Sequence, residues 1–192
     1  MRVRRAVRAL LLDGDALVLL RRTRPDRPVY WTTPGGRIEP SDASPEAALR
    51  RELDEELGAT AGPVRQVFAC GEQSPELHRL NTFYVCRLLT MDLSRRHGPE
   101  FDDPAQGRYD VDLVPCTPTA LASIDLIPAT LAAYLHDHAP DLPALLPQAP
   151  RGGTACSSGV GQRSRGAGGS VPRLRRLRLR VGSGWSVKPS VR

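Results

Sequence analysis

The chain has 192 residues, of which 40% are hydrophobic, and this is enough for one folded domain with an additional segment. Its net charge of +6 is unevenly distributed, since residues 1–146 hold 17 basic and 21 acidic side chains whereas residues 147–192 hold ten basic and no acidic ones. The basic balance therefore does not indicate a basic active site, no stretch approaches the roughly 20 apolar residues of a membrane span, and four cysteines without a C-x-x-C pattern indicate a reducing, cytoplasmic environment rather than a zinc site or disulfide framework.

The first predicted elements are two β-strands, over residues 6–12 and 16–21, joined by a turn at residues 13–15. The basic start and the apolar stretch behind it have the superficial character of a signal peptide. Arg8 interrupts that stretch, however, and no small-residue cleavage site follows it. The segment is therefore interpreted as a β-hairpin.

The next predicted element is a helix that begins behind Ser44 and ends at Gly58. Ser44 is a candidate N-cap, Pro45 suits the first helical position, and Gly58 is typical of a left-handed residue at a helix C-terminus. One face of this helix carries an apolar stripe that we expect to pack against the protein. The stripe consists of Leu49, Leu53 and Leu57.

Three carboxylates lie on the edge of this helix beside the leucine stripe. At 100° per residue, Glu52, Glu55 and Glu56 share an arc of about 100°. Like charges at this spacing destabilise a helix by a few tenths of a kcal/mol per pair, and a bound hard cation such as Mg²⁺ or Mn²⁺ would offset the repulsion. The alternative is a solvated acidic face, partly neutralised by a pair between Arg51 and Glu55.

The segment in front of the helix favours the metal-binding interpretation. WTTPGG at residues 31–36 and RELDEELGA at residues 51–59 together resemble the Nudix box, in which Gly, five residues, Glu and seven residues precede Arg-Glu-apolar-any-Glu-Glu-any-Gly-apolar. The matching residues are Gly36, Arg51, Glu52, Leu53, Glu55, Glu56, Gly58 and Ala59.

Two departures from the pattern lie in the loop before the helix. Asp42 occupies the position of the first Glu, and eight residues rather than seven separate it from Arg51. We interpret this as a shortened acid followed by one inserted residue. Because the first acid helps to position the arginine in the family, the anchor of Arg51 stays open among Asp42, Glu39 and Glu46.

The resemblance, which covers residues 4–140, implies an α/β fold, a Nudix-like α/β/α sandwich with a mixed β-sheet, in a domain of residues 1–146. It implies Mg²⁺, with Mn²⁺ possible, on the three glutamates and the backbone carbonyl of Gly36, with Arg51 as their organiser. The implied reaction is hydrolysis of a nucleoside diphosphate linked to another moiety, with water attacking a phosphorus. The general base stays open between the box glutamates, with Glu55 or Glu56 preferred, and later acids, namely Glu72, Glu100, Asp102, Asp103 and Asp112.

Behind the box, strands are predicted at residues 64–70 and 81–89 from their Val, Phe and Tyr content, and a last helix at residues 128–138. Residues 92–110 form a long polar loop that we expect to recognise the group attached to the diphosphate. Three aromatic side chains are candidates for stacking a base, although core packing is favoured for them. These are Trp31, Phe83 and Tyr84.

Residues 147–192 are rich in Gly, Ser and Arg, and we predict that they are disordered. RLRRLRLRV at residues 173–181 is a candidate for adding to a sheet edge or for contacting nucleic acid or an anionic membrane. A solvated extension is favoured, because no aromatic residues are interleaved with its arginines for base stacking and Trp185 is the only aromatic residue of the whole C-terminal segment. The expected partner is a nucleotide-type small molecule. A catalytically weak Nudix-fold nucleotide-binding or regulatory module is the alternative to an enzyme, and the substrate and oligomeric state stay open.

Overall fold

A computed structural model describes residues 2–73, 77–98 and 106–148 of the chain. The elements in the first half are β1 (Arg2–Asp13), β2 (Ala16–Arg24), β3 (Arg27–Thr32), α1 (Pro45–Leu57), β4 (Ala59–Ala61) and β5 (Arg65–Gln73). Those in the second half are β6 (Leu77–Met91), η1 (Leu93–Arg95), β7 (Arg108–Pro115), α3 (Pro118–Ala122), β8 (Leu126–Ile127), α4 (Ala129–His138), η3 (Ala139–Asp141) and α5 (Leu142–Leu145).

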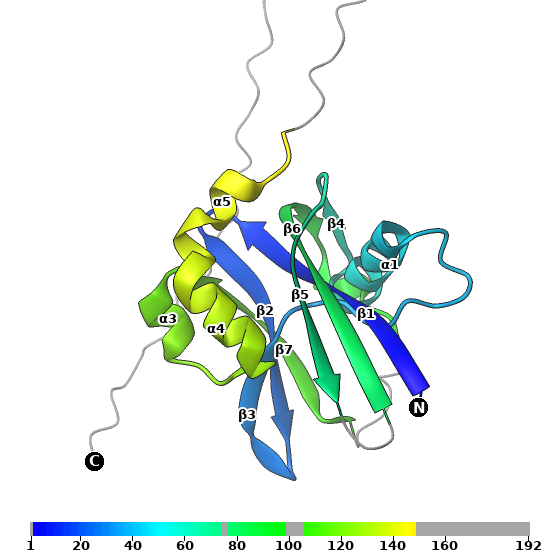
Figure 1. Ribbon diagram of the computed structural model, residues 1–192, viewed down its shortest axis with the longest axis horizontal. Coiled ribbons are helices and arrows are strands. Elements are labelled where there is room, and N and C mark those ends of the chain that lie inside the picture. The colour runs from blue at the N-terminus through cyan, green and yellow to red at the C-terminus, as the bar shows by residue number, and fades with distance from the viewer. Residues whose placement is uncertain (1, 74–76, 99–105, 149–192) are drawn as a thin grey trace, which may run out of the picture. The chain divides into compact units, whose positions relative to one another are not determined.

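The strands form one mixed sheet in the order β4-β6-β1-β2-β3-β8 (Figure 1). In addition, β5 pairs with β6 and β7 pairs with β2. Strands β1 and β6 are parallel along most of their length, whereas β1 and β2 form the antiparallel hairpin that the sequence predicts. Helix α1 covers one face of the sheet and α3, α4 and α5 cover the other, which confirms the predicted α/β class with a mixed sheet.

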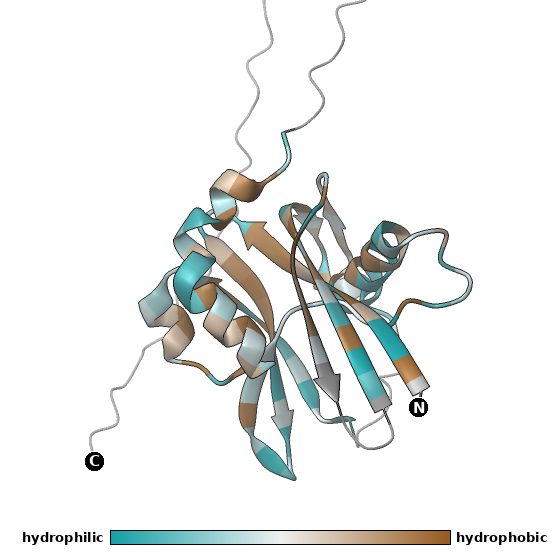
Figure 2. Ribbon diagram, in the orientation of Figure 1, coloured by the Kyte–Doolittle hydropathy of each residue, from teal (hydrophilic) through white to brown (hydrophobic). Residues whose placement is uncertain are grey.

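Alternation along the strands builds two cores, one on each face of the sheet. Val18 and Leu20 of β2 join the core beneath α1, whereas Leu17 and Leu19 join the core beneath α4. Figure 2 shows the hydrophobic segments gathered in the middle of the sheet, with hydrophilic bands on β1 and β6 near the end marked N. The apolar middle of the sheet stabilises the fold, whereas the hydrophilic ends of β1 and β6 do not belong to either core.

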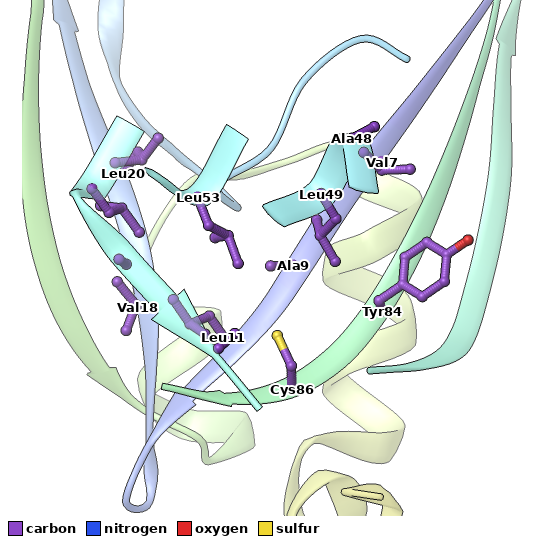
Figure 3. Close-up of a cluster of buried hydrophobic side chains, with 13 residues drawn as sticks. Val7, Ala9, Leu11, Val18, Leu20, Ala48, Leu49, Leu53, Tyr84 and Cys86 are labelled. Carbon is purple, nitrogen blue, oxygen red and sulfur yellow. The ribbon is translucent and has the colours of Figure 1, made fainter. Parts of the chain in front are cut away.

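Helix α1 is anchored by its predicted leucine stripe. Leu49 and Leu53 point toward Ala9 and Leu11 of β1 (Figure 3), and all four side chains are buried. Each fully buried leucine stabilises the fold by about 1.5–3 kcal/mol relative to exposure. The stripe therefore fixes the rotation of the helix about its axis, and with it the direction of the neighbouring glutamates.

Both ends of α1 are as the sequence predicts. The Ser44 side chain accepts a hydrogen bond from the Ala47 N–H at 3.1 Å, and Pro45 occupies the first turn. Gly58 is left-handed at φ +56°, and its N–H donates to the Asp54 carbonyl at 2.8 Å. A side chain at position 58 would also overlap the Asp92 carbonyl, so glycine is required there for two reasons.

The predicted strands are longer in the structure than in the prediction, and four further strands were not predicted at all. Strand β7 begins at Arg108, so the predicted long polar loop ends before residue 110. The other strands missing from the prediction are β3, β4 and β8. Helix α4 lies where the last helix is predicted. The predicted disordered segment, residues 147–192, lies outside the described residues from residue 149 onward.

Three cysteines in the described part of the chain are free thiols. These are Cys70, Cys86 and Cys116. Among the helices of the described segments, none has the length and hydropathy needed to cross a membrane.

Candidate active site

The candidate site lies where strands β1 and β2 separate. Their antiparallel register is confined to the closed end of the hairpin, at the pairs Leu12–Leu17 and Asp13–Ala16. Beyond it, the segment that follows β3 takes the place of β2 beside β1. The N–H groups of Ala9 and Val7 donate to the carbonyls of Pro34 and Gly36, at 2.8 and 2.9 Å. The first part of the Nudix-like pattern thus becomes part of the sheet.

Gly35 occupies a backbone position that only glycine tolerates well. Its φ is +125°, and a side chain there would overlap the Val7 carbonyl of β1. Gly36, the first residue of the predicted box, is restricted differently, because a side chain on it would overlap the Glu52 carboxylate. The two glycines therefore allow β1 and α1 to approach from opposite sides.

A cavity of about 430 Å³ opens at this junction. Glu52 and Glu56 of α1 face it together with Gly35 and Gly36. Glu56 is buried, with 7% of its surface exposed, and its Oε2 accepts a hydrogen bond from the Gly35 N–H at 2.6 Å. Burial raises the pKa of Glu52, and the nearby Arg51 guanidinium opposes that rise. Two desolvated carboxylates at one cavity wall are the kind of donor that a cation would stabilise.

Arg51 is the central hydrogen-bond donor of the helix edge. Its Nη1 donates to Glu52 Oε1 at 2.9 Å and to Glu55 Oε2 at 3.1 Å. Its Nη2 also donates to the Arg37 carbonyl at 2.9 Å. The predicted pair between residues 51 and 55 is confirmed, and one guanidinium joins the acidic edge to the loop in front of the helix.

Asp42 is the anchor of Arg51 among the three acids left open by the sequence. Its Oδ1 and Oδ2 accept from Arg51 Nε and Nη2 at 3.1 and 3.0 Å, a bidentate contact. The Asp42 carboxylate also accepts from the Glu39 N–H at 2.7 Å, so Glu39 positions Asp42 rather than replacing it. Hydrogen bonding to Arg51 lowers the pKa of Asp42. The inserted residue thus leaves the shortened acid within reach of the arginine.

The expected metal-binding set is brought together only in part. Glu52, Glu56 and Gly36 line the cavity, whereas Glu55 does not line it and is joined to Glu52 through Arg51. The Gly36 carbonyl already accepts from the Val7 N–H and keeps a second lone pair. In the described part of the chain, no three acidic, histidine or cysteine side chains are grouped closely enough to hold an ion as they stand. The donors are nevertheless all oxygens, which suits a hard divalent cation.

Arginine and tyrosine side chains also line the cavity. The Arg22 guanidinium lies 3.4 Å from the centre of the Tyr109 ring, and that of Arg27 lies 3.8 Å from the centre of the Tyr30 ring. Arg8 donates to the carbonyls of Thr33, at 3.3 Å, and of Gly35. These residues were missed by the sequence analysis. The interruption of an apolar strand by Arg8 was the one available signal.

The other aromatic candidates are structural. Phe83 is fully buried and Tyr84 is 8% exposed, so the favoured core interpretation is confirmed for both. Trp31 donates from Nε1 to Asp112 Oδ2 at 2.9 Å, which gives that candidate general base a structural partner. Among the remaining candidate bases, Glu100, Asp102 and Asp103 and the side chain of Glu72 lie outside the described residues.

Similarity to known proteins agrees with this geometry. The family model described as NUDIX domain matches residues 2–128. The chain belongs to the Nudix family. The CTP pyrophosphohydrolase of Escherichia coli (strain K12) is 31% identical to this Nudix protein over 121 residues, which cover 62% of the chain and 78% of that enzyme. The predicted Nudix resemblance and the predicted class of Nudix-type pyrophosphate hydrolase are confirmed.

Two further relatives show the extent of the likeness. The Octanoyltransferase of Myxococcus xanthus is 40% identical over 93 residues, which cover 46% of the Nudix chain. Those residues span only a quarter, 25%, of that relative's length. The solved structure titled ADP compounds hydrolase superposes with a TM-score of 0.54 at 21% identity, covering 70% of this chain and 71% of that one, and it shows the same fold.

Proposed function

We propose that the protein is a Mg²⁺-dependent hydrolase, with Mn²⁺ as a possible substitute, of a nucleoside diphosphate linked to another moiety. The observation that carries this proposal is the edge of α1, where Asp42 fixes Arg51 and Arg51 in turn fixes two glutamates beside a cavity lined by arginine. A module that only binds nucleotide has no need for clustered acids that repel one another. The alternative, a catalytically weak binding or regulatory module, predicts affinity without turnover.

Glu52, Glu56 and the Gly36 carbonyl would hold the ion, with Glu55 as a further ligand after its contact with Arg51 loosens. The ion, when bound, neutralises charge on the phosphate oxygens and lowers the pKa of a coordinated water. Nudix hydrolases generally use divalent metals, in agreement with this donor set. The roles of individual glutamates are our proposal.

The remaining residues bind and orient the substrate. Arg8 and Arg22 place positive charge in the same cavity as the carboxylates, where the diphosphate oxygens would lie. We assign the general base to Glu55 or Glu56, because both lie on the helix edge beside the cavity. Asp112, the one later acid whose side chain the structure describes, accepts from Trp31 and does not line the cavity. Tyr30 and Tyr109 offer flat faces for a base.

A nucleotide-type small molecule is the proposed partner, in agreement with the name of the Escherichia coli relative, CTP pyrophosphohydrolase. We propose a cytoplasmic location from the cysteine pattern, a catalytic domain of residues 1–146, and a C-terminal segment, residues 147–192, that is dispensable for catalysis. Contact of that segment with nucleic acid is a less favoured role.

A phosphate-release screen tests the proposal. Nucleoside triphosphates, nucleotide sugars, ADP-ribose and dinucleoside polyphosphates would be incubated with the full-length protein and Mg²⁺. Glu55→Gln and Glu56→Gln should each lower kcat by at least about 100-fold, a loss of about 2.7 kcal/mol in transition-state stabilisation. Asp54→Asn is the matched control, because Asp54 lies on the same helix but pairs with Arg95.

Two results would count against the proposal. Tight nucleotide binding without release of phosphate from any substrate would favour the binding module. Turnover by Glu55→Gln and Glu56→Gln at the wild-type rate, with Mg²⁺ still required, would remove these glutamates from the reaction while leaving the hydrolase class intact.

A further inference from the structure

A second hollow, of about 220 Å³, adjoins the active-site cavity. Arg8, Gly36, Arg37 and Arg79 line both spaces, so the two are neighbours. We refer to the second space as the arginine hollow, after the five arginines that line it. They are Arg4, Arg5, Arg8, Arg37 and Arg79.

The sheet brings these arginines together from three separate segments. Arg4 of β1 and Arg79 of β6 are direct partners in the parallel register. Arg8 follows Arg4 by four residues, which places both on the same face of β1. Arg37 is added by the bridge between its backbone and Ala6 of β1. Like charges placed directly opposite one another destabilise a sheet, so this arrangement carries a cost for the free protein.

Two acids lie near these arginines: Glu72 of β5 is the register partner of Arg79, and the Glu52 carboxylate is close enough to Arg8 to interact with it electrostatically. Among the described side chains, however, none of the five arginines forms an ion pair, and no carboxylate lines the hollow. Arg24 and Arg95, by contrast, each pair with an aspartate. The Nε of Arg4 is buried and has no hydrogen-bond partner within the described part of the chain. A buried donor without a partner destabilises the free protein, and a bound anion would supply the missing acceptor.

The guanidinium groups define the chemistry of that anion. Arginine presents a planar fork of donors that matches phosphate oxygens and binds them in bidentate fashion. The hollow has about half the volume of the active-site cavity, which suits a phosphoryl group better than a second nucleoside. It opens beside Gly36, at the end of the cavity where the diphosphate is proposed to lie.

We propose that the arginine hollow binds a phosphoryl group beyond the two at the carboxylates, so that the enzyme prefers substrates with such an additional group. This inference rests on the proposed function, which places the diphosphate at Glu52 and Glu56. The additional group is either a third phosphate of a linear chain or a phosphate on the attached moiety. Both present the same dianionic chemistry to the hollow.

A binding experiment tests the hollow without turnover. Calorimetric titration of the full-length, metal-free protein in EDTA would compare inorganic tripolyphosphate with pyrophosphate. The double variant Arg4→Gln, Arg79→Gln should weaken binding of tripolyphosphate at least about tenfold, and that of pyrophosphate less than about threefold. Arg87→Gln is the control, since Arg87 is exposed on the same strand as Arg79 and should change either affinity less than twofold.

The proposal is overturned if wild-type protein binds tripolyphosphate no more tightly than pyrophosphate, or if the double variant weakens both ligands equally. The single variant Arg79→Gln, checked by thermal unfolding, covers the case in which the double variant does not fold. Its loss of affinity should again be larger for tripolyphosphate.

Turnover then distinguishes the two sources of the additional group. The two candidate substrate classes are nucleoside triphosphates and ADP-ribose phosphorylated on its distal ribose, and ADP-ribose itself is the reference. For whichever class the wild-type enzyme prefers, we expect the double variant to lower kcat/KM at least tenfold more than it does for ADP-ribose, through a higher KM. Selective binding of tripolyphosphate without hydrolysis of any substrate contradicts the proposed function alone. Hydrolysis whose substrate selectivity is the same in the wild type, the double variant and the single variant Arg79→Gln contradicts the arginine hollow alone.

Discussion

At the scale of single residues, Arg51 determines the arrangement of the site. One guanidinium donates to Asp42, Glu52 and Glu55, and also to a backbone carbonyl. Lysine could not replace it, because a single ammonium lacks the fork needed for the bidentate contact with Asp42. The side chain of Asp42 is 6% exposed, so solvent competes little for this pair.

Asp42→Ala should lower kcat/KM about tenfold, and Arg51→Ala at least about 100-fold. The difference is expected because Arg51 keeps its other acceptors when Asp42 is lost, whereas removal of Arg51 leaves Glu52 and Glu55 without their shared donor. Steady-state kinetics measure both effects. Asp137→Ala is a control on the exposed end of α4. Equal losses in the two variants would show that Asp42 is as essential as the arginine.

The same pair has a pH signature. Because Arg51 lowers the pKa of Asp42 below its value in the unfolded chain, the pair stabilises the fold at neutral pH and loses its contribution as pH falls through the lowered pKa. The difference in unfolding free energy between wild type and Asp42→Ala should therefore shrink below about pH 4. Urea unfolding at several pH values measures it.

At the scale of elements, α1 joins the fold to the chemistry. Its leucines pack into the core beneath the sheet, while its N-cap and its left-handed C-terminal residue set where the helix starts and stops. Because Glu52 and Glu56 lie beside the leucines, packing on one face aims the carboxylates at Gly35 and Gly36. Stability and active-site geometry are therefore coupled through the rotation of one helix.

Ser44→Ala should lower the free energy of unfolding by about 1 kcal/mol, because the Ala47 N–H loses its acceptor. The glutamates lie two to three turns further along the helix, so kcat should stay within about twofold of wild type. Chemical denaturation and steady-state kinetics check the two outcomes. Ser41→Ala in the exposed loop before the helix is the control, and an equal loss of stability there would argue against the capping role.

At the scale of the whole molecule, the two cores support different parts of the structure. The core beneath α1 supports the glutamates, whereas the core beneath α4 is completed by the last described segment of the chain. Leu142 of α5 is fully buried in it, and Leu145 and Leu146 pack against it. The described core packing therefore extends to residue 146.

A chain ending at Leu146 should retain hydrolytic activity and keep its free energy of unfolding within about 0.5 kcal/mol of the full-length value, since residues 147–192 are predicted to bury little apolar area. A chain ending at Asp141 should lose at least about 2 kcal/mol, because Leu142 is removed from the core. Thermal and urea unfolding compare the three lengths. Unfolding of the longer truncated chain would show that the C-terminal segment is part of the structure.

The sequence by itself determined helix α1, its two ends, the arc of its three glutamates and the Nudix resemblance. These features are local, because capping, helical periodicity and motif spacing act within a few residues of one another. The extent of the strands was harder to predict, and β7 was missed, with its first residues inside the predicted loop of residues 92–110, since a strand gains its stability from distant partners.

Only the tertiary structure decided which acid holds Arg51, that Glu55 lies off the cavity, and that five arginines meet in one hollow. Arg4 and Arg79 are 75 positions apart in the chain, yet they are direct neighbours in the sheet. Sequence spacing cannot reveal such a pairing, because the register of two strands is fixed by the hydrophobic pattern of the whole sheet and not by the residues that it brings together.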